Sequence, residues 1–225
     1  MKTLAILPVK SFGAAKRRLA ESLGAGSRQA LAQAMFTDVL GALRRTAELD
    51  EIAVITSDRT AESAARGQGV VVLADTVQAG QSEAARIGIG HALAHGFDRV
   101  ALVPGDTPLL QPGDLAGLLT RSGPGVSVVP DRRGTGTNAL VLTPPDAIEP
   151  SFGPESRTRH VALAELADVP VRIDEVPTLA LDVDTPDDLA ALAAELDRRR
   201  GQAQSTRGTL RQLDRARVVP VRASA

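Results

Sequence analysis

The chain has 225 residues, of which 43% are hydrophobic and 24% charged, and its formal net charge is −1. These values are typical of one globular domain with a sizeable core, and a charge near zero gives no field that attracts nucleic acid or a membrane. The chain contains no Trp, Tyr or Cys. It therefore lacks the aromatic platforms of single-stranded nucleic-acid binders, disulfides and cysteine nucleophiles. No apolar run approaches the ~20 residues of a membrane span, and we expect a soluble, cytoplasmic protein.

Apolar runs bounded by turn residues predict strands, and apolar residues at helical spacing predict helices. In the first half we expect a strand at 4–7, a helix at 28–48 capped by Ser27, a strand at 52–57, a helix at 60–67, a strand at 70–73, a helix at 82–95 ending at Gly96, and a strand at 99–103. In the second half we expect a helix at 113–121, strands at 126–129 and 139–142, a helix at 157–167, strands at 171–175 and 179–181, and a helix at 186–199.

Strands that alternate with helices, around all-apolar central strands, predict an α/β fold. The expected architecture is a three-layer sandwich with a mostly parallel, mixed sheet. Gly88 and Gly90 weaken their helix and indicate close packing on that face. The periodic pattern stops at residue 201, and the segment 201–225 is rich in Arg. We therefore expect one domain at 1–200 and a basic, disordered tail at 201–225, whose deletion leaves catalysis nearly unchanged.

The apolar run that begins at Val100 ends abruptly at Pro104-Gly105, and Asp106 is the first charged residue after it. Ligands of open α/β sheets bind beyond the carboxyl ends of the strands. Asp106 is therefore a candidate ligand of a hard cation such as Mg2+, and Gly105 lets a large ligand approach the backbone. The alternative is a carboxylate that only caps the next element.

A second carboxylate cluster lies at the start of the last expected helix. Thr185 and Asp188 have the spacing of a helix cap, which accounts for both of them. Capping does not account for Asp182 and Asp184, which alternate at the end of an apolar stretch. A divalent cation shared with Asp106 would remove the repulsion between these carboxylates.

A basic loop follows the first strand. Residues 8–19 combine Lys10, Lys16, Arg17 and Arg18 with small residues, which suits a phosphate-binding cradle. The loop has neither a P-loop pattern nor a Gly-x-Gly-x-x-Gly pattern. The alternative is a solvated basic turn.

Three further polar segments adjoin expected strand ends. The loop 74–83 carries Gln81 and Ser82, which could contact a base edge or merely cap a helix. The segment 134–138 and the helix start at Ser156, flanked by Arg157 and Arg159, are candidate anion sites, although each alone also fits a surface loop. Together with the two carboxylate clusters, these segments predict an enzyme that joins two anionic substrates on Mg2+.

The residues also resemble a known family, the 2-phospho-L-lactate guanylyltransferases, also called phosphoenolpyruvate guanylyltransferases, over about residues 1–199. The resemblance is carried by Pro8-Val-Lys10, Ala15-Lys16 with Arg18-Leu19, Pro104-Gly-Asp106-x-Pro-Leu, Gly134-Thr-Gly-Thr-Asn138, Phe152-Gly153 with Ser156 and His160, and Leu181-Asp-Val-Asp-Thr-Pro186. It implies a Rossmann-like nucleotidyltransferase fold that moves GMP from GTP onto phosphoenolpyruvate or 2-phospho-L-lactate and releases diphosphate. The implied pathway is coenzyme F-420 biosynthesis, in which a downstream transferase accepts the labile product.

The resemblance also implies a role for each matching residue. It implies that the catalytic residues are Lys16, Arg18 and Asp106, and that Mg2+ is bound by Asp106, Asp184 and Asp182. The implied contacts to GTP come from Pro8, Val9, Lys10, Lys16, Gln81, Ser82 and Gly105. The implied contacts to the acceptor come from Thr137, Asn138, Gly153 and Ser156. Many relatives have Gly-Leu-Asn where this chain has Gly80-Gln81-Ser82, which leaves the strictness of guanine selectivity open. Two alternatives remain: another acceptor, such as 3-phosphoglycerate, molybdopterin or a sugar phosphate, and a non-catalytic GTP-binding module.

Overall fold

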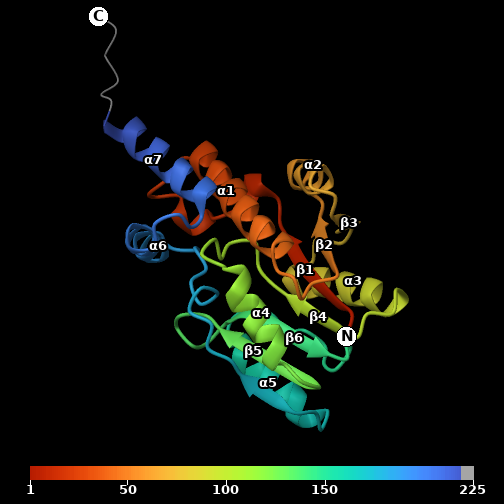
Figure 1. Ribbon diagram of the computed structural model, residues 1–225. Coiled ribbons are helices and arrows are strands. Elements are labelled where there is room, and N and C mark those ends of the chain that lie inside the picture. Colours follow the sequence, from red (N-terminus) through yellow and green to blue (C-terminus); the bar gives the residue numbers. More distant parts are fainter. Residues whose placement is uncertain (219–225) are drawn as a thin grey trace, which may run out of the picture.

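A mixed sheet forms the centre of the molecule. The structure is a computed structural model that describes residues 1–218 (Figure 1). Its sheet has 7 strands in the order β3-β2-β1-β4-β6-β5-β7. The strand β6 runs antiparallel to both of its neighbours, β4 and β5, and the other pairs are parallel. The expected mostly parallel, mixed sheet is thus confirmed.

The strands are β1 (Thr3–Val9), β2 (Glu51–Thr56), β3 (Val71–Ala74), β4 (Arg99–Leu102), β5 (Gly125–Pro130), β6 (Thr137–Thr143) and β7 (Val171–Ile173). The helices are α1 (Ala25–Arg44), α2 (Arg59–Gly67), α3 (Gln81–Ala94), α4 (Pro112–Arg121), α5 (Ser156–Leu166), α6 (Pro186–Arg198) and α7 (Gln204–Val218), with short 3-10 turns at Phe12–Ala14 and Arg17–Leu19. The helix α1 begins after Gly24, not after the expected cap Ser27, which lies inside its first turn.

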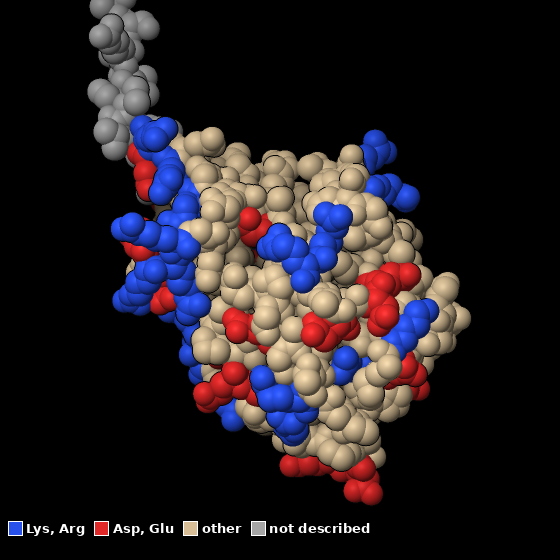
Figure 2. All heavy atoms as spheres, viewed as in Figure 1, with Lys and Arg blue, Asp and Glu red and all other residues tan. Residues whose placement is uncertain are grey.

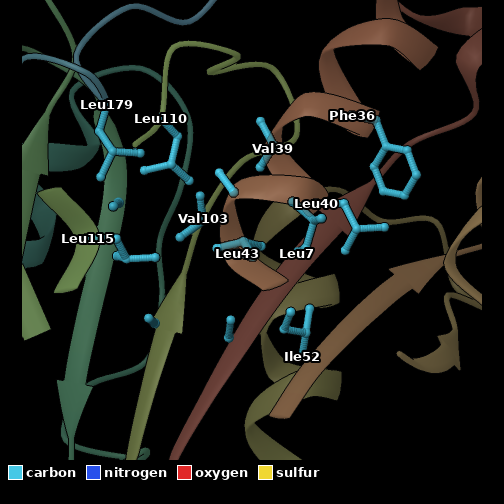
Figure 3. Packing of buried hydrophobic residues seen from close by; sticks show 14 of the residues in the cluster. Leu7, Phe36, Val39, Leu40, Leu43, Ile52, Val103, Leu110, Leu115 and Leu179 are labelled. Carbon is cyan, nitrogen blue, oxygen red and sulfur yellow. The ribbon is translucent and has the colours of Figure 1, made fainter. Parts of the chain in front are cut away.

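The alternation of side chains along β1 assigns the helices to two faces of the sheet. Leu7 belongs to a buried cluster with α1, α2 and α4, which includes Phe36 and Leu115 (Figure 3). Its neighbour Ile6 belongs to the cluster on the opposite face, formed with α3 and α5. Both clusters consist mainly of aliphatic side chains, so the core holds together with very few aromatic rings. The three-layer sandwich is confirmed.

Glycine lets α3 approach the sheet closely. A Cβ atom added at Gly88 would lie 2.6 Å from the side chain of Ile6, whereas one added at Gly90 would meet open space. The close packing expected from this helix is therefore real at Gly88 only. The helix ends as expected, with Gly96 after the C-cap residue and in the left-handed region at φ 66°.

The expected disordered tail is wrong over the described part. Residues 204–218 form α7, which lies alongside α1 (Figure 1). Leu210 and Leu213 of α7 pack on a third buried cluster built from α1 and α6. The first turn of α7 is held by Asp38, whose carboxylate accepts the backbone N–H groups of Ser205 at 3.0 Å and Thr206 at 2.7 Å. Residues 219–225, also part of the expected tail, lie outside the described residues.

The Arg-rich C-terminal segment forms α7 over its described part, and α6 before it also carries arginines. Figure 2 shows Lys and Arg gathered over α6 and α7. The residues concerned are Arg198, Arg199, Arg200, Arg207, Arg211 and Arg215. Among residues 1–218, no helix is long and apolar enough to cross a membrane.

The expected strand at 179–181 is also wrong. The segment forms a turn, in which the backbone N–H groups of Leu179 and Ala180 both donate to the carbonyl of Val176. Its carbonyl groups are not in a ladder, because the side chain of Asn138 donates to Leu179 at 2.8 Å and to Ala180 at 3.0 Å. The apolar run reflects burial of Leu179 in the core, not strand pairing.

Candidate active site

One cavity of about 760 Å3 opens beyond the carboxyl ends of β1 and β4. Because β6 is antiparallel, its first residues Thr137 and Asn138 lie at the same edge of the sheet. Apart from Ser82, Arg157 and Arg159, the residues expected from the sequence line this cavity: Pro8, Val9, Lys10, Lys16, Arg18, Gln81, Gly105, Asp106, Thr137, Asn138, Gly153, Ser156, Asp182 and Asp184.

Lys16 joins the two carboxylate clusters. Its Nζ lies 2.5 Å from Oδ2 of Asp106 and 3.0 Å from Oδ1 of Asp184. Burial alone would lower the pKa of Lys16, but the two carboxylates outweigh that effect and raise it above its ordinary value. The backbone of Lys16 is left-handed, with φ 56°, and this geometry turns the side chain of a surface loop into the carboxylate cluster.

Asp182 is the carboxylate with the most perturbed environment. Burial raises the pKa of Asp182 to about 6, and the negative charges of Asp106 and Asp184 add to that effect. Nδ2 of Asn138 donates to Oδ1 of Asp182 at 3.1 Å and opposes the rise. Both N–H groups of the Asn138 amide are therefore used to hold the 179–182 segment, which leaves only its carbonyl oxygen for a ligand. The expected contact of Asn138 with an anionic acceptor stays a prediction.

The helix start predicted after Asp184 is confirmed. The hydroxyl of Thr185 accepts the backbone N–H of Asp188, and the carboxylate of Asp188 accepts the backbone N–H of Thr185 at 2.8 Å. Burial would raise the pKa of Asp188, but hydrogen bonds from Thr185, Asp184 and Arg132 outweigh it and lower the pKa. This carboxylate therefore ties the β5–β6 loop to α6 and fixes the backbone that carries Asp184.

The basic loop 8–19 is anchored at its centre. Oδ2 of Asp58, the N-cap of α2, accepts the backbone N–H of Phe12 at 2.9 Å, and the Phe12 ring packs against Phe36 with centroids 5.7 Å apart. The loop is thus positioned over the cavity. Lys10, Arg17 and Arg18 are exposed at its surface, where they can reach an anionic ligand.

Arg157 and Arg159, expected to form an anion site at the start of α5, have other partners. Nη1 of Arg157 donates to the carbonyl of Gly134 at 2.9 Å. Arg159 donates to the hydroxyl of Ser151 at 3.0 Å and to the carbonyl of Pro154. Their guanidinium groups hold the two loops on either side of Ser156, and neither residue lines the cavity. The expectation failed because these backbone acceptors come from folded loops that the local sequence does not reveal.

Ser82 also has a structural contact: its hydroxyl accepts the backbone N–H of Phe152 at 2.9 Å. It connects the start of α3 to the loop before α5, and it does not line the cavity. Sequence reasoning missed Asp75, a buried residue of the cavity wall directly after β3. One of its carboxylate oxygens accepts the backbone N–H of Gln78 at 2.8 Å. Its position at a strand end was the signal that could have identified it.

The carboxylates of Asp106 and Asp184 can supply part of the ligand set of a divalent cation. Asp106 and Asp184 both contact one cationic group, the ammonium of Lys16, so their oxygens converge on a single point. Within residues 1–218, no group of three or more His, Asp or Glu is arranged to enclose a metal by itself. Two converging carboxylates still suit Mg2+, because Mg2+ commonly takes one or two carboxylates and completes its shell with phosphate oxygens and water.

The fold and the position of the cavity define the class of protein. A solved structure described as a nucleotidyl transferase from Methanothermobacter is similar to this chain, with a TM-score of 0.66 and 18% sequence identity. The similarity covers 88% of this chain and 98% of that chain. The fold is therefore the α/β nucleotidyltransferase fold, as the sequence predicted.

The sequence comparisons give the family. The family model described as "Guanylyl transferase CofC like" matches residues 3–225. A phosphoenolpyruvate guanylyltransferase of Conexibacter woesei is 52% identical over 95% of this chain and 97% of its own length. A 2-phospho-L-lactate guanylyltransferase of Methanothermobacter thermautotrophicus is 34% identical over 100% of this chain and 96% of its own length. The chain belongs to the guanylyl transferase CofC-like family.

Proposed function

We propose that this enzyme transfers GMP from GTP to the phosphate of phosphoenolpyruvate, releases diphosphate, and requires Mg2+. The central observation is the convergence of Lys16, Asp106 and Asp184 between a basic loop and a polar acceptor side of one cavity. Family membership supports guanylyl transfer, and the name of the relative with 52% identity supports phosphoenolpyruvate as the acceptor. 2-Phospho-L-lactate is the second candidate, because it names another relative.

The reaction joins two phosphates that repel each other in water. An oxygen of the acceptor phosphate attacks the α-phosphorus of GTP, and the bond from that phosphorus to the bridging oxygen breaks as diphosphate leaves. The attacking oxygen is already anionic at neutral pH, so no general base is needed. Lys10, Lys16 and Arg18 would bind the triphosphate and stabilise charge on the leaving diphosphate.

Asp106 and Asp184 would hold Mg2+, with Asp182 beside them. Bound there, Mg2+ supplies positive charge that polarises the phosphate oxygens. Lys16 contacts these same carboxylates, so its ammonium neutralises part of their charge in the protein by itself. The same ammonium would also contact phosphate groups of a nucleotide bound in the cavity.

Asp75 would contribute guanine selectivity. Asp75 lines the cavity together with Gly80 and Gln81 at the start of α3, and one of its carboxylate oxygens accepts the backbone N–H of Gln78. Guanine presents two adjacent N–H donors on its Watson–Crick edge, which a carboxylate can accept together. Adenine presents a ring acceptor at the corresponding position, which a carboxylate repels.

The product would be a phosphoanhydride between GMP and a three-carbon acid, for use in coenzyme F-420 biosynthesis. Such an activated product is labile, which supports a downstream transferase as a partner that accepts it. The family assignment supports the guanylyl transfer step itself.

The test is diphosphate release from the purified chain. GTP, ATP and CTP are each combined with phosphoenolpyruvate, 2-phospho-L-lactate or 3-phosphoglycerate, with Mg2+ or with EDTA, and the guanylylated product is identified by mass spectrometry. We expect release with GTP and phosphoenolpyruvate that EDTA abolishes. GTP binding without release for any acceptor would refute catalysis, release with 3-phosphoglycerate alone would refute the acceptor, and full release in EDTA would refute Mg2+.

A further inference from the structure

His160 is a fully buried side chain of α5 that the proposed reaction does not use. Both of its ring nitrogens have partners. Nε2 lies 2.9 Å from the backbone nitrogen of Ser151, and Nδ1 lies 3.0 Å from Oγ1 of Thr137. The ring of Phe152 packs edge-on against it, with centroids 5.2 Å apart. His160 therefore connects the start of β6 to the loop before α5, and both segments line the acceptor side of the cavity.

These contacts determine which nitrogen of His160 carries the proton. A backbone N–H can only donate, so Nε2 must accept the N–H of Ser151 with a lone pair. A neutral imidazole has one N–H, which must then be on Nδ1. Burial lowers the pKa of His160 to about 4, with a further contribution from the charge of Arg159, so the ring is neutral at physiological pH. Nδ1 therefore donates to Oγ1 of Thr137.

This donation decides what Thr137 can offer to a ligand. Oγ1 of Thr137 accepts one hydrogen bond from His160, and it has no other partner within residues 1–218. Its own proton must therefore point elsewhere, and the residue lines the cavity. Thr137 thus offers a donor to the ligand. With the opposite tautomer, the Thr137 hydroxyl would donate to Nδ1 and turn a lone pair toward an anionic substrate.

We propose that His160 is a positioning residue for the acceptor: its Nδ1–H orients the Thr137 hydroxyl to donate to an anionic oxygen of the phosphorylated acid, and its Nε2 holds the 151–153 segment. The identity of that acid rests on the proposed function. The second contact matters because Gly153, at φ 118°, is the last residue of this segment and lines the same cavity. One buried ring thus fixes both sides of the acceptor subsite.

Two substitutions separate the two contacts. In His160→Asn, the amide nitrogen takes the place of Nδ1 and can still donate to Thr137. In His160→Gln, the amide oxygen can reach the place of Nε2 and accept from Ser151, but the donation to Thr137 is lost. We expect His160→Gln to raise the KM for phosphoenolpyruvate at least ~10-fold with the KM for GTP unchanged, and His160→Asn to recover most of that loss.

A double-mutant cycle tests the route through Thr137. In a Thr137→Val background, His160→Gln should add less than about 2-fold to the KM for phosphoenolpyruvate, because the hydroxyl that it orients is gone. Thr137→Ser retains the hydroxyl and is the matched control. Equal effects of His160→Gln with and without the Thr137 hydroxyl would overturn the proposal, as would a KM for GTP that rises in parallel.

Nitrogen NMR of the wild-type imidazole gives a test that does not depend on turnover or on folding of the variants. We expect the His160 ring to carry its proton on Nδ1 between pH 6 and 8. A ring protonated on Nε2, or on both nitrogens, would overturn the inference even if the enzyme is active. Absence of turnover with every acceptor would instead refute the proposed function and leave this assignment of the tautomer intact.

Discussion

The contact between α7 and α1 predicts that the C-terminal helix stabilises the domain. Asp38→Ala removes a carboxylate that accepts two backbone N–H groups in the first turn of α7. Loss of a helix N-cap costs about 0.5–2 kcal/mol, and two charge-assisted bonds place this site near 2 kcal/mol. Deletion of 203–225 also removes the packing of Leu210 and Leu213, both partly buried, at about 1 kcal/mol each. Ordering the helix opposes these gains, so we expect the deletion to lower the free energy of unfolding by about 2–4 kcal/mol.

The assay is urea unfolding followed by far-UV circular dichroism, because the chain has no Trp or Tyr to report by fluorescence. With a urea m value of about 3 kcal/mol/M, the midpoint should fall by roughly 0.5 M in Asp38→Ala and by about 1 M in the deletion. Asp214→Ala, an exposed carboxylate on α7 itself, is the matched control and should not move it. Midpoints of the first two variants that equal the wild-type value would refute a stabilising role for α7.

Three further predictions concern the cavity. Asp106→Asn should lower kcat roughly 100-fold or more with an unchanged dichroism spectrum, and near-wild-type turnover would exclude Asp106 from catalysis. Asp75→Asn should lower kcat/KM for GTP about 10–100-fold and raise kcat/KM for XTP, because the C2 carbonyl of xanthine can accept a hydrogen bond from the new amide. Unchanged kinetics with GTP and XTP would contradict the contact between Asp75 and the base. Because the pKa of Asp182 is raised from 3.8 to about 6, its favourable contribution to folding is present below pH ~4 and is lost as the pH rises through 6. In EDTA, Asp182→Asn should therefore gain stability relative to wild type between pH 4 and 6, and parallel unfolding curves over that range would show that Asp182 is not perturbed.

Local pattern was sufficient for most of the fold. Leu4 to Leu7 form a buried strand because a central strand with helices on both faces must be apolar at every position. The helix end at Gly96 and the helix start at Thr185–Asp188 depend only on neighbouring residues, and both were predicted correctly. The rule that α/β sheets bind ligands beyond the carboxyl ends of their strands correctly predicts that Asp106 and Lys16 lie at one edge.

The failures involve contacts made by folded loops or by residues distant in the sequence. The helix α7 has few apolar residues, and its first turn depends on Asp38, which lies more than 160 residues earlier. The 179–181 segment is apolar because Leu179 is buried, but its carbonyls bond to Asn138 instead of a strand. Arg159 was expected at a ligand and donates to backbone carbonyls, and His160 was too isolated in the sequence to suggest a role. None of these contacts leaves a signature in the local sequence.

Because β6 runs antiparallel to its neighbours, the two sides of the cavity are built from different segments of the chain and can change independently. In the proposed reaction, loops that follow the parallel strands β1, β3 and β4 would bind the nucleotide, whereas the beginnings of β6 and α5 would bind the acceptor. A substitution at Thr137 or in 151–156 can change the second substrate without disturbing the loops over the first. An ancestral enzyme with this sheet could therefore change its acceptor by small steps while it kept its nucleotide. Libraries restricted to 134–138 and 151–156 are the direct way to redesign what the enzyme accepts.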